Sequence, residues 1–168
     1  MRKQSGFTLV ELIIVIAMVA VITAFALPNF LSWLPNYRLR SATQDLFSNF
    51  QKAKLEAVKR NINTMVCFSG TDYTVFVDSL PLNAPNFQQD VGEDVVTQVN
   101  WSDYKGISAS LGAINFPTVG ANKCFTFRPN GIPVDVTYTA ISGNAQVSNT
   151  SGKTTTVFVI EAGSIRIE

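Results

Sequence analysis

Three acids of this 168-residue chain, Asp90, Glu93 and Asp94, form the one small cluster of carboxylates that could carry chemistry. Oxygen ligands could bind calcium there, but the spacing matches no calcium-loop motif, so we expect a solvated acidic loop. Lys123 beside Cys124 could pair a base with a nucleophile, but consecutive strand residues face opposite sides. The chain has no histidine, the commonest general base and metal ligand. Because it also lacks a phosphate-binding loop and a dinucleotide fingerprint, we predict no enzyme, no cofactor and no metal site.

The two cysteines, Cys67 and Cys124, form no CxxC motif, so a zinc site is not expected. Both lie in strand-like segments, "TMVCFS" and "KCFTFR", where free cysteines pack as small apolar side chains. Outside the cytoplasm they could instead form a disulfide. That bond would close a loop of about 58 residues and could stabilise the fold by on the order of 4 kcal/mol. The sequence leaves both alternatives open.

Charge is distributed unevenly along the chain, although the formal net charge is only +1. Residues 29–60 contain six Lys/Arg against two Asp/Glu, a balance of +4, whereas residues 61–168 contain five against nine, a balance of −4. Domains that bind nucleic acid usually present a basic face. The acidic body therefore argues against nucleic acid as the main partner.

Glu11 stands alone at the start of a long apolar segment. No residue from Leu12 to Leu34 is charged, and about 20 apolar residues suffice to span a bilayer. The positive-inside rule would keep Arg2 and Lys3 in the cytoplasm and place the body outside. A cleaved secretory signal is the alternative, because "AFA" at 24–26 resembles a signal peptidase site. The length of the apolar run and the acid inside it argue against that alternative.

A carboxylate inside a membrane costs roughly 2.5–3.5 kcal/mol at the bilayer centre and should have a partner. No cation lies within the apolar segment. A cut between Gly6 and Phe7 would create an α-amino group one helical turn from Glu11, on the same face. The carboxylate could then pair with its own N-terminus or with that of a neighbouring subunit. The second pairing would make Glu11 an assembly residue.

The segment "GFTLVELIIVIAMVAVI" resembles the N-terminus of type IV pilins and type II secretion pseudopilins. Their pattern is a short basic leader, Gly, then Phe-Thr-Leu-x-Glu and an apolar run. Here those positions are Gly6, Phe7, Thr8, Leu9 and Glu11. The resemblance implies cleavage after Gly6 and N-methylation of Phe7 by a prepilin peptidase. The implied partners are other pilins or pseudopilins, an inner-membrane assembly platform and membrane lipid.

Two prolines follow the apolar segment. Pro28 is expected to break or kink the helix, because proline lacks the N–H donor and clashes with the preceding turn. Filament pilins resemble this chain in having a proline at about the same place. Pro35 could break the helix again; the alternative is that the membrane segment simply ends and a second helix starts after Pro35.

An apolar stripe with a spacing of three or four residues predicts an amphipathic helix that packs on a sheet. Its members are Leu39, Ala42, Leu46, Phe50, Ala53 and Ala57, widened by Phe47 and Val58. We expect the basic face of this helix to be solvated or to meet lipid headgroups. Asn61 and Asn63 are expected to end the helix.

The apolar period changes to two after Asn63, which is typical of strands. "TMVCFSGTDYTVFVD" predicts two strands with a turn at 70–72, and "KCFTFRPNGIPVDVTYT" predicts a strand, a Pro-Asn-Gly turn and a strand. "TTTVFVIEAGSIRIE" predicts a closing hairpin with Gly163 in its turn. Weaker strand candidates are 94–101, 106–111 and 113–118, and 79–94 is expected to be an exposed loop.

The predicted fold class is therefore α+β. A long N-terminal helix, with a membrane-spanning half and an amphipathic half, packs on a mostly antiparallel β head. We divide the chain into a basic leader (1–6), a transmembrane and polymerisation helix (7–27), an amphipathic helix (28–62) and a β-rich periplasmic head (63–168).

The amphipathic helix, "FTFRPNG" at 125–131 and a final Gly-x-x-Arg resemble the GspH/FimT-type minor pseudopilins. The resemblance implies a single-pass inner-membrane protein with a periplasmic head, near the tip of a type II secretion pseudopilus. Relatives implicated in DNA uptake use basic residues near the C-terminus, where the family often has Gly-Arg-x-Arg. Here Ser164 occupies the first basic position. Arg166 remains a candidate contact for DNA or a partner. The alternative is that it is a solvated strand residue without a binding role.

Two other functions compete with the pseudopilin hypothesis. The first is a minor type IV pilin that primes pilus assembly or binds DNA during uptake. The second is a single-pass anchored periplasmic domain that never polymerises.

Overall fold

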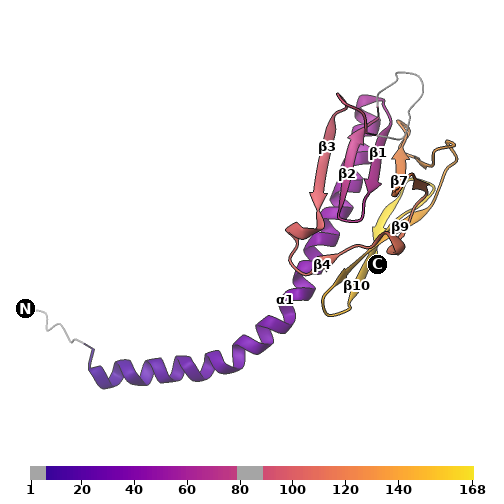
Figure 1. The fold of residues 1–168 in the computed structure, drawn as a ribbon. Helices are drawn as coiled ribbons and strands as arrows, with labels where there is room; N and C mark the ends of the chain where they lie inside the picture. The colour runs from indigo at the N-terminus through magenta and orange to yellow at the C-terminus, as the bar shows by residue number, and fades with distance from the viewer. Residues whose placement is uncertain (1–6, 79–88) are drawn as a thin grey trace, which may run out of the picture. The chain divides into compact units, whose positions relative to one another are not determined.

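The computed structural model describes residues 7–78 and 89–168. The chain divides into two compact units, the first ending at Leu34 and the second beginning at Pro35. Gly6, the predicted cleavage position, lies outside the described residues, and so does most of the loop predicted at 79–94. Figure 1 shows the elements in chain order. Each unit is described by itself.

Helix α1 runs from Leu9 to Arg60 and contributes to both units. Pro28 and Pro35 both lie inside it. Of the predicted break or kink at Pro28, the break is therefore wrong, and the kink stays a prediction. The alternative of a second helix starting after Pro35 is wrong as well. Each proline removes only one N–H donor, and with it one hydrogen bond of the helix. The predicted boundary between residues 27 and 28 therefore does not coincide with the end of a helix.

The first unit consists of the apolar part of α1. Every residue from Phe7 to Trp33 is exposed within the structure. Among the described residues, α1 is the one helix long and apolar enough to cross a membrane, judged by length and composition. Within residues 7–78 and 89–168, none of these side chains is buried.

The amphipathic part of α1 belongs to the second unit, and its predicted stripe is confirmed. All six main positions are buried: Leu39, Ala42, Leu46, Phe50, Ala53 and Ala57. Phe47 packs against the rim of the core, as predicted, but Val58 is 49% exposed. Phe50 lies at the centre of the core, where its ring makes edge-to-face contacts with Phe68, Phe116 and Phe125.

Helix α1 ends where the sequence predicts. Asn61 follows its last residue with φ at +55°, in the left-handed region that asparagine tolerates better than most residues. The Ile62 N–H donates to the Ala57 carbonyl at 3.3 Å. This is the bond of a Schellman motif, which satisfies a carbonyl left free at the helix end.

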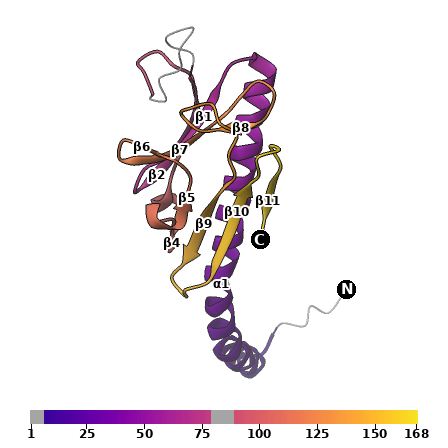
Figure 2. The same ribbon diagram turned by 90° about the vertical axis from the view of Figure 1, so that its right-hand side faces the viewer.

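The head contains two antiparallel sheets (Figures 1 and 2). The first has the order β3-β2-β1-β7-β6, with β8 paired to β7. Its strands are β1 (Thr64–Phe68), β2 (Asp72–Val77), β3 (Val95–Asn100), β6 (Thr118–Val119), β7 (Asn122–Phe127) and β8 (Pro133–Val134). The second has the order β11-β10-β9-β4, with β5 paired to β9. Its strands are β4 (Ile107–Ser108), β5 (Ile114–Asn115), β9 (Gly143–Asn149), β10 (Thr154–Val159) and β11 (Ile165–Ile167).

Both sheets contribute to one core with α1. The predicted hairpins β1–β2 and β10–β11, the β7–β8 pair and strand β3 are confirmed. Two short 3-10 helices, Trp101–Asp103 and Leu111–Ala113, lie between the short strands. Strand β9, a central strand of the second sheet, was not predicted. Its sequence "GNAQVSN" has little β-branched or aromatic content, although alternate residues are buried.

Candidate functional site

The N-terminal site is built on the first turn of α1. The Thr8 Oγ1 accepts a hydrogen bond from the Glu11 backbone N–H at 3.2 Å, and the Leu12 N–H donates to the Thr8 carbonyl at 3.2 Å. Thr8 and Glu11 thus occupy the two positions of a capping box, Ser/Thr-x-x-Glu. A carboxylate in the first turn is also favoured by the helix dipole. Sequence reasoning missed this role of Thr8, although the motif can be read directly from the sequence.

The Glu11 side chain lies among exposed apolar residues. Phe7 is 77% and Leu9 73% exposed, and Glu11 is exposed as well. No ion pair of Glu11 occurs in the described part of the chain. The turn therefore presents a carboxylate to the surroundings, one helical turn from Phe7. Pro28 lies far along the same helix and takes no part in this site.

Cys67 in β1 and Cys124 in β7 are joined by a disulfide. The two residues lie directly opposite each other in the antiparallel register, with 4.2 Å between their Cα atoms. The Cys124 N–H donates to the Pro117 carbonyl at 2.9 Å, on the side away from β1. The bond thus joins a non-hydrogen-bonded pair, where opposite side chains come closest. Cys124 packs with Met65 and Phe76 in a small second core.

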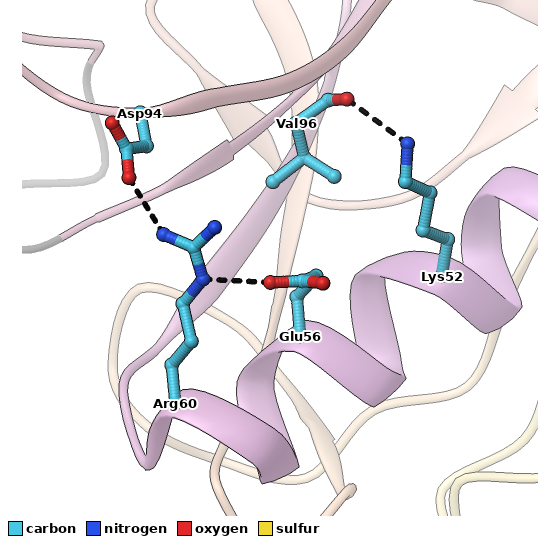
Figure 3. Close-up of polar contacts among 5 residues, drawn as sticks. All are labelled: Lys52, Glu56, Arg60, Asp94 and Val96. Carbon is cyan, nitrogen blue, oxygen red and sulfur yellow. Dashed lines mark hydrogen bonds and ion pairs between the residues drawn. The ribbon is translucent and has the colours of Figure 1, made fainter.

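The acidic cluster does not converge on one point. Asp94 pairs with Arg60 at 2.6 Å, and Arg60 also pairs with Glu56 at 2.6 Å (Figure 3). The hydrogen bonds that the Arg60 guanidinium donates to Asp94 and, with a smaller effect, to Glu56 raise its pKa. The Glu93 carboxylate instead accepts from the Asp90 backbone N–H at 2.9 Å. Among the described residues, no group of three or more candidate ligands could hold a metal ion.

The basic face of α1 stays largely exposed, as one of the two expectations had it, but some of its cations also contact the head backbone. Lys52 Nζ donates to the Val96 carbonyl at 3.2 Å, as Figure 3 shows. Arg38 donates to the Lys105 carbonyl at 3.3 Å. Sequence reasoning could not find these contacts, because backbone acceptors leave no signal in residue types.

Two tyrosines of the head bond to the same side of α1: Tyr73 in β2, and Tyr104 just after the 3-10 helix Trp101–Asp103. Tyr73 accepts a hydrogen bond from the Asn49 amide at 2.7 Å, and Tyr104 donates to the Asp45 carboxylate at 2.8 Å. Burial raises the pKa of Tyr73 to about 12, against a small opposing effect of the Asn49 bond. Burial and the Asp45 carboxylate both raise the pKa of Tyr104.

Arg166 in β11 has partners within the chain. Its guanidinium carbon lies 5.4 Å from the centre of the Phe158 ring, and its Nε is 2.9 Å from a carboxylate oxygen of Glu168. The Arg166 side chain is 54% exposed. The neighbouring carboxylate weakens the attraction of this guanidinium for a phosphate. A contact of Arg166 with DNA or a partner stays a prediction.

Two family models match the chain. Residues 1–27 match the prokaryotic N-terminal methylation motif, and residues 42–163 match the family described as type II transport protein GspH. The chain belongs to the GspH family. The predicted membership in the type IV pilin and pseudopilin superfamily is thereby confirmed, and the family supplies structural subunits rather than enzymes.

One known protein resembles this GspH-family chain in sequence, and two solved structures resemble it in fold. The pilin-like protein PilA1 of Thermus thermophilus is 30% identical over 173 residues, which cover 98% of this chain and 99% of the relative. The minor pilin FimU of Pseudomonas aeruginosa has a TM-score of 0.54 at 18% identity, over 79% of this chain and 90% of that chain. The minor pseudopilin EpsH of the Vibrio cholerae type 2 secretion system has a TM-score of 0.55 at 10% identity, over 78% and 96%. The predicted α+β class is confirmed.

Two segments that carry the GspH-type resemblance meet in the head. Gly131 closes "FTFRPNG", and Gly163 opens the final Gly-x-x-Arg; their φ angles are +77° and +79°. Lys54 Nζ donates to the Gly163 carbonyl at 2.8 Å. A Cβ at Gly163 would collide with the Gly131 carbonyl oxygen, and one at Gly131 would lie 2.8 Å from Lys54 Cε. The two glycines let two turns and a lysine of α1 pack together.

Proposed function

We propose that this GspH-family chain is a minor pseudopilin of a type II secretion system. Its N-terminal helix would assemble it into a periplasmic pseudopilus near the tip, after cleavage behind Gly6 and N-methylation of Phe7 by a prepilin peptidase. The observation that carries this proposal is the first turn of α1. An exposed carboxylate there stands at the start of a helix whose next residues, Leu12 to Leu34, carry no charge.

The assembly mechanism follows from the cost of the Glu11 charge. In the inner membrane, an unpaired carboxylate is unfavourable by roughly 2.5–3.5 kcal/mol at the bilayer centre. The α-amino group of Phe7 on a neighbouring subunit would neutralise it. Joining the filament relieves this cost, while the surrounding apolar side chains pack between subunits. The head then needs no catalytic group, only a stable surface on the periplasmic side of the membrane.

The alternative proposal is a minor type IV pilin, and two findings favour it. The curated relative at 30% identity is called a pilin-like protein, and FimU, with a similar fold, is a minor type IV pilin. Priming of pilus assembly needs the same N-terminal turn. DNA binding is less well supported, because Arg166 lies beside Glu168 and the head is acidic.

Replacing Glu11 tests the assembly mechanism. We expect Glu11→Leu to insert into the inner membrane at the parent level but to fall at least tenfold in the filament fraction, because the carboxylate that pairs with the neighbouring amine is lost. Glu161→Leu is the matched control, since Glu161 is an exposed acid of the head. Quantitative immunoblots of membrane and sheared-filament fractions measure both. Normal assembly of Glu11→Leu would refute the role given to this acid.

A deletion strain separates the two systems. The proteomes of culture supernatant and periplasm are compared with those of the parent strain. Exoproteins that leave the supernatant and accumulate in the periplasm support the pseudopilin proposal. Unchanged secretion with loss of surface pili supports the pilus alternative. If secretion and pili are both unchanged, the chain is an anchored domain and both proposals fail.

A further inference from the structure

Strand β3 lies at one edge of the first sheet and strand β11 at one edge of the second sheet. The contacts along these two edges differ. An open strand edge presents unpaired N–H and C=O groups and can accept another strand. On β3, Lys52 from α1 covers the edge, because its Nζ donates to the Val96 carbonyl at 3.2 Å and to Thr97 Oγ1 at 3.1 Å (Figure 3). A charged side chain of the helix thus blocks this edge.

The free edge of β11 lacks such a cover. Glu168 exchanges two hydrogen bonds with Thr156 of β10, at 2.8 and 2.9 Å, and the Ser164 carbonyl accepts from the Ile160 N–H at 2.9 Å. Backbone groups alternate sides along an antiparallel strand. The N–H and C=O groups of Ile165 and Ile167 therefore point away from β10. No hydrogen bond to these four groups is found in the ranges 7–78 and 89–168, and Figure 2 shows β11 at the margin of its sheet.

The surroundings of this edge are amphipathic. On the core side, Ile167 and Phe47 of α1 are partly buried and pack against the rim of the core. On the outer side, Arg166 and Glu168 are about half exposed, at 54% and 55%. A strand laid beside β11 would bury apolar residues on one face and keep polar residues on the other, which is the ordinary pattern of a strand.

We propose that the free edge of β11 binds an extended segment of a neighbouring filament subunit, which joins the second sheet as a further strand. This inference rests on the proposed function, because it takes the neighbour to be another pilin-like subunit. Main-chain hydrogen bonds supply the affinity in this mode of recognition, and alternate side chains supply the specificity.

The length of the edge argues for a filament neighbour. Ile165 and Ile167 offer two donors and two acceptors, so an added strand gains at most four main-chain hydrogen bonds. So short an edge holds a freely diffusing partner poorly. A subunit whose own helix lies in the same filament is present at a high effective concentration, and a weak contact is then sufficient.

Proline at position 167 tests the pairing. Ile167→Pro removes an N–H that points outward and leaves the bonds to β10 in place, which is where a strand tolerates proline. We expect the amount of the Ile167→Pro variant recovered in sheared filaments to fall by about tenfold, because its avidity for the filament depends on the strand pairing at β11. Ile167→Val keeps the N–H and is the matched control. Thermal unfolding of the full chain in detergent checks that both variants fold.

Photo-crosslinking provides a second measurement that needs no proline. A photoreactive residue replaces Arg166 at the edge, or Gln146 at the centre of the same sheet as the matched control. We expect an adduct with another filament subunit from position 166 and none from position 146. The inference would be overturned by equal adducts at both positions or by an adduct with a non-filament protein. Normal recovery of folded Ile167→Pro in filaments would overturn it as well. Absence of the parent chain from filaments would instead refute the proposed function, and the inference with it.

Discussion

Gly163 is a position where a single methyl group should be costly. Its φ is +79°, and an added Cβ would collide with the Gly131 carbonyl oxygen, which is backbone and cannot move aside. Gly152 is the matched control, with φ at +77° and nothing within 4 Å of an added Cβ. We expect Gly152→Ala to lower the free energy of unfolding by about 1 kcal/mol and Gly163→Ala by about 3 kcal/mol. Denaturant titration of the chain in detergent measures both, and equal losses would contradict the packing argument.

Tyr73 should make the head sensitive to alkaline pH. Burial raises its pKa from 10.0 to about 12, so above pH 10 the unfolded chain releases this proton while the folded chain keeps it. Stability is therefore complete below pH 10 and falls as the pH rises toward 12, by on the order of 2–3 kcal/mol. Thermal unfolding between pH 8 and pH 11.5 measures the slope.

Tyr73→Phe is the control for this pH dependence. Phenylalanine has no phenolic proton, so the variant should show a shallower loss of Tm above pH 10, although it is less stable throughout because Asn49 loses its partner. Tyr104 contributes in the same direction, since its pKa is raised as well. An unchanged slope in Tyr73→Phe would mean that other groups control the alkaline transition.

At the scale of elements, the left-handed backbone conformation at the end of α1 leads to a prediction about the stability of Asn61 variants. Asn61 has φ at +55° in the Schellman motif. Asn61→Ala should lower the free energy of unfolding by about 1 kcal/mol, because alanine is strained in the left-handed region. Asn61→Gly should stay within about 0.5 kcal/mol of the parent, because glycine adopts that region freely. Denaturant titration measures both, and equal stability of the alanine and glycine variants would contradict this view of the helix end.

The elements also show why some structure could be predicted from sequence and some could not. The stripe of α1 repeats every three or four residues, and burial follows this period directly. Strand β9 has Ala145 and Val147 as its inward apolar side chains, between Gly143 and Asn149. Its extended state depends on pairing with β10, the next strand in the chain, and with β4 and β5, which have two residues each and are too short to be recognised.

In the candidate sites, too, local spacing could be predicted from the sequence and contacts between distant segments could not. Phe7, Thr8 and Glu11 lie within one turn, so their spacing alone places them together. The contacts of Lys52 and Lys54 end on backbone carbonyls in distant strands and turns, and only the folded head reveals them. The expected break at Pro28 is wrong because one missing hydrogen bond is not enough to end a long helix.

For the whole molecule, the disulfide should be the largest single contribution to stability. Cys67 and Cys124 are separated by 57 residues, and closing a loop of this length stabilises a fold by about 4 kcal/mol in the chain-entropy model. We expect the Cys67→Ala/Cys124→Ala chain to lose about this free energy of unfolding. The parent should lose it on reduction, and the double variant should not respond to reductant. A parent chain that unfolds identically with and without reductant would show that the bond contributes little.

The last strands of the chain, β9 to β11, are needed to complete the core around α1. Lys54 of α1 meets the Gly163 carbonyl across 109 residues, and β9 and β10 supply buried Ala145, Val147 and Val157 to the core around the helix. If the head is exported as proposed, the amphipathic helix would reach the far side of the membrane before these strands do, because it precedes them in the chain. The nascent chain must therefore wait with part of its apolar stripe uncovered, when chaperones can bind it. The last hairpin would therefore complete the cover of the apolar stripe, since Val157, Val159 and Ile165 belong to the core around α1.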